Sequence, residues 1–162
     1  MTGVAGETDE ADVKEQYLTT IRLIERLHRR FLDVIKAELD RLGVEDINNV
    51  QTLILANIGE EQLTVGELTA RGYYLGSNVT YNVKKLVEND YLILERSAHD
   101  KRMMRVRLSE KGLDLTRQID GFHERNAEEI RGDIATREQL LDINRILTSI
   151  ERYWSRLISF GR

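Results

Sequence analysis

Apolar residues recur at helical spacing near both ends of the chain. From Asp12 to Leu42 they fall three, four or seven positions apart, and Gly43 follows. This predicts one helix of about 30 residues, longer than a small domain buries, so we expect part of its stripe to meet another chain. Near the C-terminus, apolar residues spaced alternately three and four apart are typical of a helix-packing seam. This seam consists of Leu140, Ile143, Leu147, Ile150, Trp154 and Leu157.

Three shorter helical segments follow the first. Asn48–Gln51 has the composition of a capping box, and Gly59 is expected to end that helix. Thr64–Glu67 is a second capping box, which opens a short helix. Ser77, a preferred N-cap residue, is expected to open the third. The inward face of this third helix is expected to hold Val79, Val83, Leu86 and Val87.

The period of the pattern changes at Tyr91. Residues 91–96 and 103–108 are strand-like, and a polar connection joins them. In the second strand, apolar residues alternate with Arg105 and Arg107, which predicts a β-hairpin with a charged tip and a basic outer face. Ser109 is expected to cap another long helix, which breaks between Gly132 and Thr136 ahead of the terminal seam.

These elements together predict a mainly α-helical fold with a small β-hairpin wing (α+β). It is a winged helix-turn-helix flanked by long N- and C-terminal dimerisation helices. We divide the chain into a mobile acidic tail (1–11), an N-terminal dimerisation helix (12–45), a DNA-binding domain (46–108) and C-terminal linker and dimerisation helices (109–162). Long helices at opposite chain ends favour a homodimer, and an intramolecular bundle is the alternative.

Charge is distributed unevenly. The chain has a net charge of −4, but the segment from Gly76 to Arg107 contains seven basic and four acidic residues. The local excess matters more than the sum, because a nucleic acid contacts one face of a protein. The candidate DNA-binding residues are Ser77, Asn78, Thr80, Tyr81, Lys84 and Lys85 on the third short helix and Arg96, Lys101 and Arg102 on the hairpin.

These residue types suit the grooves of double-stranded DNA. Asn78 has the amide that pairs with adenine in a major groove, and Thr80 could touch a thymine methyl. Lys84 and Lys85 are suited to phosphates, which position a protein without specifying sequence. A charge run by itself is more often a solvated surface, and the order of the helices and the hairpin favours DNA contact here.

Several short motifs resemble those of the MarR family of transcriptional regulators. Asp100–Arg102 followed by Leu108–Gly112 is similar to the family's wing signature, and Gln51, Glu67–Leu68 and Val79–Thr80 fall where the family has its Q, E-L-A and V-T elements. The resemblance covers residues 12–160. It implies that Arg102 enters the minor groove and that Asp100 orients the arginine.

The resemblance also implies an effector. Many proteins of this family release DNA when a small aromatic or phenolic molecule binds between the dimerisation helices and the DNA-binding lobe. His28, Phe31, Ile54 and Phe122 lie on the elements that would line such a crevice. Packing in the core is the more common role for apolar residues at helical spacing, so that alternative stays open for each.

Composition argues against several other classes. The chain has no cysteine, which excludes disulfides and thiol chemistry, and it contains no nucleotide-binding or hydrolase motif, so we expect no enzymatic activity and no cofactor. His123, Glu124 and Glu128 could bind a metal, but a solvated helix face is the simpler reading, and we expect no metal. Without a long apolar run or a signal sequence, we expect a cytoplasmic protein and no membrane partner.

Two functions from different classes fit the pattern. The first is a ligand-responsive repressor or activator that binds a pseudo-palindromic operator as a homodimer. The second is a winged-helix protein–protein interaction module without DNA binding. The basic outer face favours the first, because an interaction module tends to expose apolar residues there.

Overall fold

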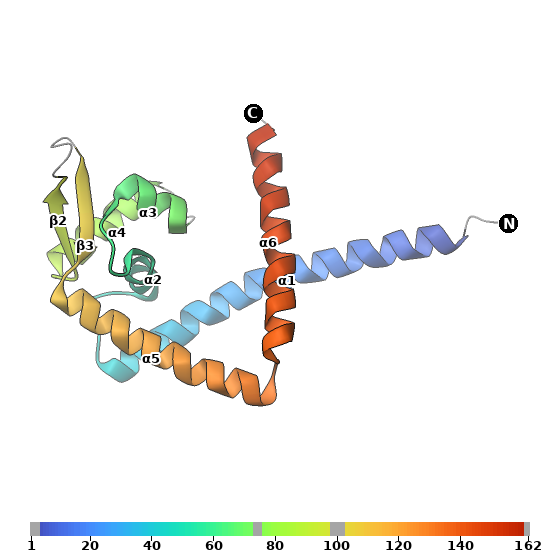
Figure 1. The fold of residues 1–162 in the computed structure, drawn as a ribbon, viewed down its shortest axis with the longest axis horizontal. Helices are drawn as coiled ribbons and strands as arrows, with labels where there is room; N and C mark the ends of the chain where they lie inside the picture. The colour runs from blue at the N-terminus through green and yellow to red at the C-terminus, as the bar shows by residue number, and fades with distance from the viewer. Residues whose placement is uncertain (1–3, 73–75, 98–102, 161–162) are drawn as a thin grey trace. The chain divides into compact units, whose positions relative to one another are not determined.

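A computed structural model describes the backbone of residues 4–72, 76–97 and 103–160 (Figure 1). Its elements are α1 (Val4–Leu42), α2 (Asn49–Ile58), β1 (Leu63–Thr64), α3 (Val65–Gly72), α4 (Gly76–Glu88), β2 (Leu92–Arg96), β3 (Met104–Leu108), α5 (Glu110–Asp133) and α6 (Arg137–Phe160). The chain divides into two compact units, Met1–Arg117 and Gln118–Arg162, and α5 spans the boundary. Helices with one small antiparallel sheet agree with the expected fold class.

The first helix begins at Val4 and not at Asp12. Residues 4–11, which we expected to form a tail, are therefore helical. The sequence pattern misses this turn because the segment lacks large apolar residues.

The capping residues confirm the expected start and end of α2 and the expected start of α3. Asn48 Oδ1 accepts a hydrogen bond from the Gln51 backbone N–H at 2.9 Å, and Gln51 Oε1 accepts one from the Asn48 N–H at 3.0 Å. Gly59 ends α2 with a φ of 57°, a conformation that glycine adopts without steric cost. Thr64 and Glu67 form the second capping box at the start of α3.

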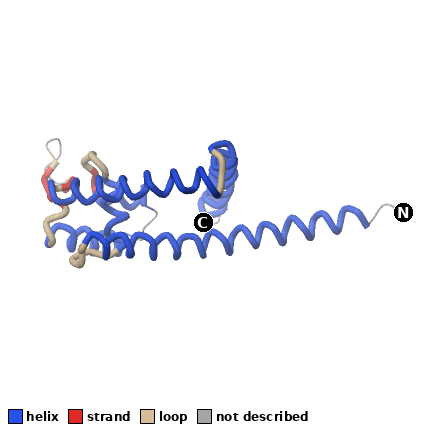
Figure 2. Tube along the Cα trace, turned by 90° about the horizontal axis from the view of Figure 1, so that it is seen from below, coloured by secondary structure: helices blue, strands red, loops and turns tan. Residues whose placement is uncertain are grey.

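The core of the first unit lies between the C-terminal half of α1, the three short helices and the sheet. Its most deeply buried side chains are Ile35, Leu39, Ile54, Leu55, Ile58, Leu68, Val79, Leu86 and Val106. Figure 2 shows the strands of this unit gathered at one end, with helices making up the rest. The N-terminal half of α1 extends away from α2, α3 and α4 (Figures 1 and 2).

The sheet has three strands in the order β1-β3-β2, all antiparallel. Leu92 pairs with Leu108 and Arg96 with Met104, which confirms the hairpin. The additional strand β1 pairs Leu63 with Val106. Sequence analysis misses β1, because two residues are too few to show an alternating pattern.

The alternation along β3 changes toward the wing tip. Val106 and Leu108 are buried, whereas Met104, on the same face of the strand, is exposed. The core therefore covers β3 at Val106 and Leu108 but not at Met104.

The start of α5 is fixed by close contact with the turn before β2. Ser109 caps the helix, because its Oγ accepts a hydrogen bond from the Gly112 N–H at 3.0 Å. A Cβ atom on Gly112 would lie 2.3 Å from the Tyr91 carbonyl oxygen. Only glycine fits at this point without moving the backbone.

Candidate nucleic-acid interface

Helix α4 has two chemically distinct faces. Its inward face packs Val79, Val83 and Leu86 into the core. Val87, expected beside them, is only half-buried. The outward face carries exposed Asn78, Thr80, Tyr81 and Lys84, with half-buried Lys85 at its edge. The apolar face thus fixes which polar residues point outward.

Ser77 is placed differently from our expectation. The helix begins at Gly76, so Ser77 lies inside it and does not cap it. The side chain of Ser77 lies outside the described residues.

The two lysines of α4 share one carboxylate partner. Lys85 Nζ lies 2.8 Å from Glu88 Oε2, and Lys84 Nζ lies 3.9 Å from Glu88 Oε1. The hydrogen bond from Lys85 lowers the pKa of Glu88 and raises that of Lys85, so both groups stay charged near neutral pH. A phosphate that binds either lysine therefore competes with Glu88.

An amide bridge that sequence analysis missed joins α4 to α2. Gln51 Nε2 donates a hydrogen bond to Asn82 Oδ1 at 3.2 Å, and Asn82 Nδ2 donates one to the Asn78 carbonyl oxygen at 2.8 Å. Gln51 is buried. The polar type of Asn82, between the inward and outward stripes of α4, is the only sequence signal for this contact.

The hairpin is less basic on its outer face than expected. Arg107 Nη2 lies 2.8 Å from Glu95 Oε1 on the neighbouring strand, and this contact lowers the pKa of Glu95. Arg105 Nη1 donates to the Gln62 carbonyl oxygen at 3.4 Å, and its buried Nε has no hydrogen-bond partner within the described part of the chain. Both arginines are half-buried. Arg107 pairs with the opposite charge of Glu95 across the strands, and Arg105 bonds to the backbone before β1.

Among the other wing candidates, Arg96 is exposed at the end of β2. Asp100, Lys101 and Arg102 lie outside the described residues. Their proposed roles at the wing tip therefore rest on the sequence.

A polar cluster of Asp46, Tyr91 and Lys111 joins the α1–α2 connection to the start of β2 and the first turn of α5. Asp46, between α1 and α2, accepts hydrogen bonds from the Tyr91 hydroxyl at 2.8 Å and from Lys111 Nζ at 2.7 Å. Lys111 Nζ also lies 4.1 Å from the centre of the Tyr91 ring. Partial burial opposes ionisation of Asp46, but the bonds from Lys111 and Tyr91 outweigh it and lower its pKa. Burial and the bond to Asp46 raise the pKa of the Tyr91 hydroxyl.

Comparison with known proteins places this lobe in a family. The sequence profile of the MarR family matches residues 45–103. The chain is 40% identical to the exopolysaccharide II synthesis transcriptional activator ExpG of Rhizobium meliloti (strain 1021) over 158 residues. This alignment covers 96% of the present chain and 80% of ExpG. The chain belongs to the MarR family.

Solved structures with the same fold include FabT and a MarR protein. The Streptococcus pneumoniae FabT structure in complex with DNA matches with a TM-score of 0.72 and 20% identity, covering 87% of this chain and 99% of that one. The Staphylococcus aureus MarR structure with salicylate and kanamycin matches with a TM-score of 0.71 and 20% identity, covering 90% and 97%. These matches show the fold, and membership of the MarR family makes the present chain a transcriptional regulator and not an enzyme.

The four effector candidates of this MarR protein differ in exposure. His28 and Phe31 are exposed on α1, whereas Ile54 is completely buried in the core of the first unit. Phe122, on α5 in the second unit, is half-buried, and its ring centre lies 5.6 Å from that of His123. Ile54 therefore contributes to packing, and a ligand would reach it only if the core opened.

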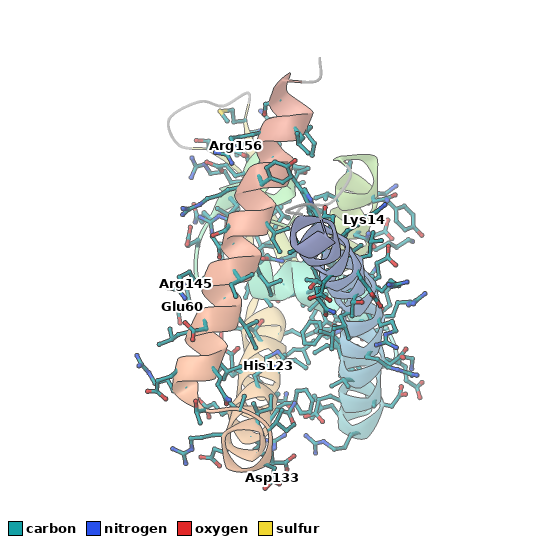
Figure 3. All side chains as sticks on the ribbon, turned by 90° about the vertical axis from the view of Figure 1, so that its right-hand side faces the viewer. Lys14, Glu60, His123, Asp133, Arg145 and Arg156 are labelled. Carbon is teal, nitrogen blue, oxygen red and sulfur yellow. The ribbon has the colours of Figure 1, made fainter. Side chains whose placement is uncertain are left out.

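The expected dimerisation residues form an apolar stripe on α6, whose side chains are drawn in Figure 3 with Arg145 and Arg156 labelled. Leu140, Ile143, Leu147 and Leu157 are exposed in the single chain, by 39%, 47%, 38% and 55%. Ile150 and Trp154 are half-buried. A capping box of Thr136 and Gln139, which sequence analysis missed, begins this helix.

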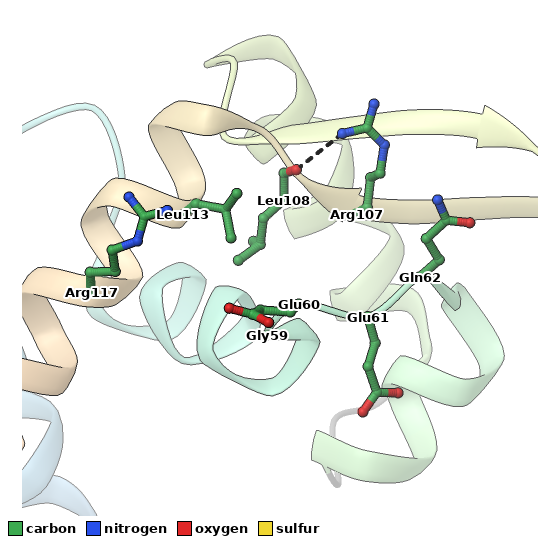
Figure 4. Close-up of a pocket in the computed structure, with 8 residues that line it drawn as sticks. All are labelled: Gly59, Glu60, Glu61, Gln62, Arg107, Leu108, Leu113 and Arg117. Carbon is green, nitrogen blue, oxygen red and sulfur yellow. Dashed lines mark hydrogen bonds between the residues drawn. The ribbon is translucent and has the colours of Figure 1, made fainter.

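A small cavity of about 260 Å³ lies between the end of α2, β3 and the start of α5 (Figure 4). Leu108 and Leu113 form its apolar part, and Arg107 and Arg117 lie at its edge. Both arginines already have carboxylate partners, Glu95 and Asp114.

Within the described ranges no three acidic or histidine side chains are grouped to hold a metal, and no helix has the length and apolar character needed to cross a bilayer.

Proposed function

We propose that this MarR protein binds a pseudo-palindromic DNA operator as a homodimer and regulates transcription in response to a small molecule. The observation that carries the proposal is the outward face of α4. An exposed helix face with an amide, a hydroxyl and two lysines above a fully buried apolar face is the arrangement of a recognition helix. The FabT structure with DNA, which has the same fold, supports this use of the lobe.

Different residues of the surface have different tasks. Asn78, near the start of α4, and Thr80 and Tyr81 beside it read base edges in the major groove. Ser77, Lys84 and Lys85 contact phosphates, which set the register of the helix on the duplex. At the wing, Arg96, Lys101 and Arg102 bind the backbone or an adjacent minor groove, and Asp100 orients Arg102.

The homodimer is supported by apolar surface that one chain leaves uncovered. The seam residues of α6 and several apolar residues of α1, among them Leu23 and Leu27, are exposed. Burying an apolar stripe of this kind is the main driving force for association. Two copies related by a two-fold axis would present two copies of α4 to half-sites about 10 base pairs apart.

Regulation has two parts in this proposal. The R. meliloti relative is named an activator, which favours activation over repression here. The S. aureus MarR structure with salicylate favours a small aromatic acid as effector, for which His28 and Phe31 on α1 are exposed candidate contacts. Salicylate added to the protein–DNA complex is expected to release the duplex, and an affinity that salicylate leaves unchanged contradicts this effector class.

The proposed function is tested by selecting duplexes from a random-sequence pool with the wild-type protein. Sequencing is expected to return an inverted repeat. Lys84→Ala should weaken binding to the selected duplex and to a scrambled one alike, and lower the slope of log affinity against log salt by about 1. Lys36→Ala is the matched control, because Lys36 also forms an i,i+4 ion pair but lies on α1. A pool in which no sequence becomes enriched contradicts the proposal.

A further inference from the structure

The amide bridge between α2 and α4 is a directional chain of hydrogen bonds. Gln51 Oε1 is occupied by the Asn48 N–H at 3.0 Å, so the amide nitrogen of Gln51 must face α4. There it donates to Asn82 Oδ1 at 3.2 Å, which turns the Asn82 amide nitrogen toward the Asn78 carbonyl at 2.8 Å. Each amide has one orientation that satisfies both of its partners.

A separate hydrogen bond joins the first turn of α2 to the long helix α1. Asn49, the neighbour of the α2 N-cap, donates from Nδ2 to the Leu32 carbonyl oxygen at 3.0 Å. The first turn of α2 is therefore fixed on one side to α1 and on the other to α4. Its position sets where the start of α4 lies in relation to α1.

Apolar packing alone does not set the rotation of α4 closely. Val79, Val83 and Leu86 hold the helix against the core, but hydrophobic contact has no preferred direction, and small rotations preserve most of it. A hydrogen bond weakens steeply when its angle changes, so the bridge from Gln51 to Asn82 restricts that rotation. The rotation of α4 sets the direction in which its outward side chains point, and that of Asn78 in particular.

We propose that Gln51 and Asn82 are positioning residues for sequence reading, which hold the outward face of α4 at the angle that base contacts require. The inference rests on the proposed function, because it assumes that α4 reads DNA. Neither side chain contacts DNA in this proposal. They act through Asn78 and its neighbours, since recognition needs side chains held to within about 0.5 Å by a supporting layer.

Two variants break the bridge in different ways. Gln51→Glu keeps an oxygen that accepts the Asn48 N–H, and glutamate suits this position of a capping box, but it has no amide to donate to Asn82. Asn82→Ala removes the other half and leaves the capping box intact. The matched control is Asn57→Ala, because Asn57 also donates to the carbonyl four residues earlier, at 2.9 Å, and this hydrogen bond stays within α2.

The measurement is the ratio of dissociation constants for a scrambled duplex and for the duplex selected by the wild type. We expect both bridge variants to lower this ratio about tenfold, roughly the discrimination of one base contact, while the salt slope and scrambled-duplex affinity stay those of wild type. Asn57→Ala should keep the wild-type ratio. A merely structural role would lower the melting temperature of all three variants and leave the ratio unchanged.

The outcomes separate the two proposals. A wild-type protein that prefers no duplex overturns the proposed function itself. A wild-type preference that both folded bridge variants retain overturns the positioning role alone. A ratio that falls equally in Asn57→Ala also overturns it, because the loss of base discrimination is then not specific to the bridge.

Discussion

Helices α4 and α6 both carry an apolar stripe, but a single chain covers only one of them. In α4 the stripe residues Val79, Val83 and Leu86 are at most 5% exposed, whereas on α6 Leu140 and Leu157 are 39% and 55% exposed. The apolar stripe of α4 is thus covered within one chain, and that of α6 is not. The difference places the proposed DNA reading and the proposed dimerisation on separate parts of the sequence, which mutations can address separately.

The largest effect is expected on α6. Leu147→Glu combined with Ile150→Glu should raise the dimer dissociation constant by more than about 100-fold, because association would bury unpaired charges. Sedimentation at micromolar concentration measures it. Arg145→Glu on the same helix is the control, since its exposed side chain forms only a local pair with Asp142. A wild-type protein that sediments as a stable monomer contradicts the proposed homodimer.

Two glycines of α5 sharpen the same contrast at the level of packing. Gly112→Ala should lower the free energy of unfolding by about 3 kcal/mol, because its Cβ would lie 2.3 Å from the Tyr91 carbonyl oxygen. A Cβ atom on Gly132 would have no neighbour within 4 Å, so Gly132→Ala should raise the free energy of unfolding by about 0.5–1 kcal/mol. Urea denaturation compares the two, and equal effects of the two substitutions would show that the start of α5 is not closely packed.

A smaller effect is expected at Asp46. Its pKa is lowered in the folded protein, so the stability from its ionised form is present above the unfolded pKa and is lost as the pH falls through the folded one. Asp46→Asn should cost less than about 1 kcal/mol at pH 7, because the pair with Lys111 is partly exposed and screened. The difference from wild type should shrink as the pH falls below about 4. A pH-independent difference means that packing and not charge makes the contribution.

The sequence predicts those elements whose signals are local. The capping residues Asn48 and Thr64, the C-cap Gly59 and the alternation of β2 and β3 depend on neighbours within a few positions, and the structure agrees with each. The strand β1 escapes because its pairing with Val106 is long-range and only two residues take part.

The candidate site divides in the same way. Helical spacing correctly separates the outward residues Asn78 and Lys84 from the buried stripe of α4. It does not find the partners that come from elsewhere in the chain. The bridge from Gln51 to Asn82 and the pair of Arg107 with Glu95 join residues that are far apart in sequence, so only the fold brings them together.

The central claim is that the outward face of α4 reads DNA sequence, and the most direct measurement is the base preference of Asn78→Ala. Duplex selection with this variant is expected to return the wild-type repeat with one position in each half-site relaxed, because one amide contact to a base is lost. Lys84→Ala, selected in parallel, should keep every preference and bind more weakly. An Asn78→Ala protein that selects the same repeat with the same preference at every position would contradict the account.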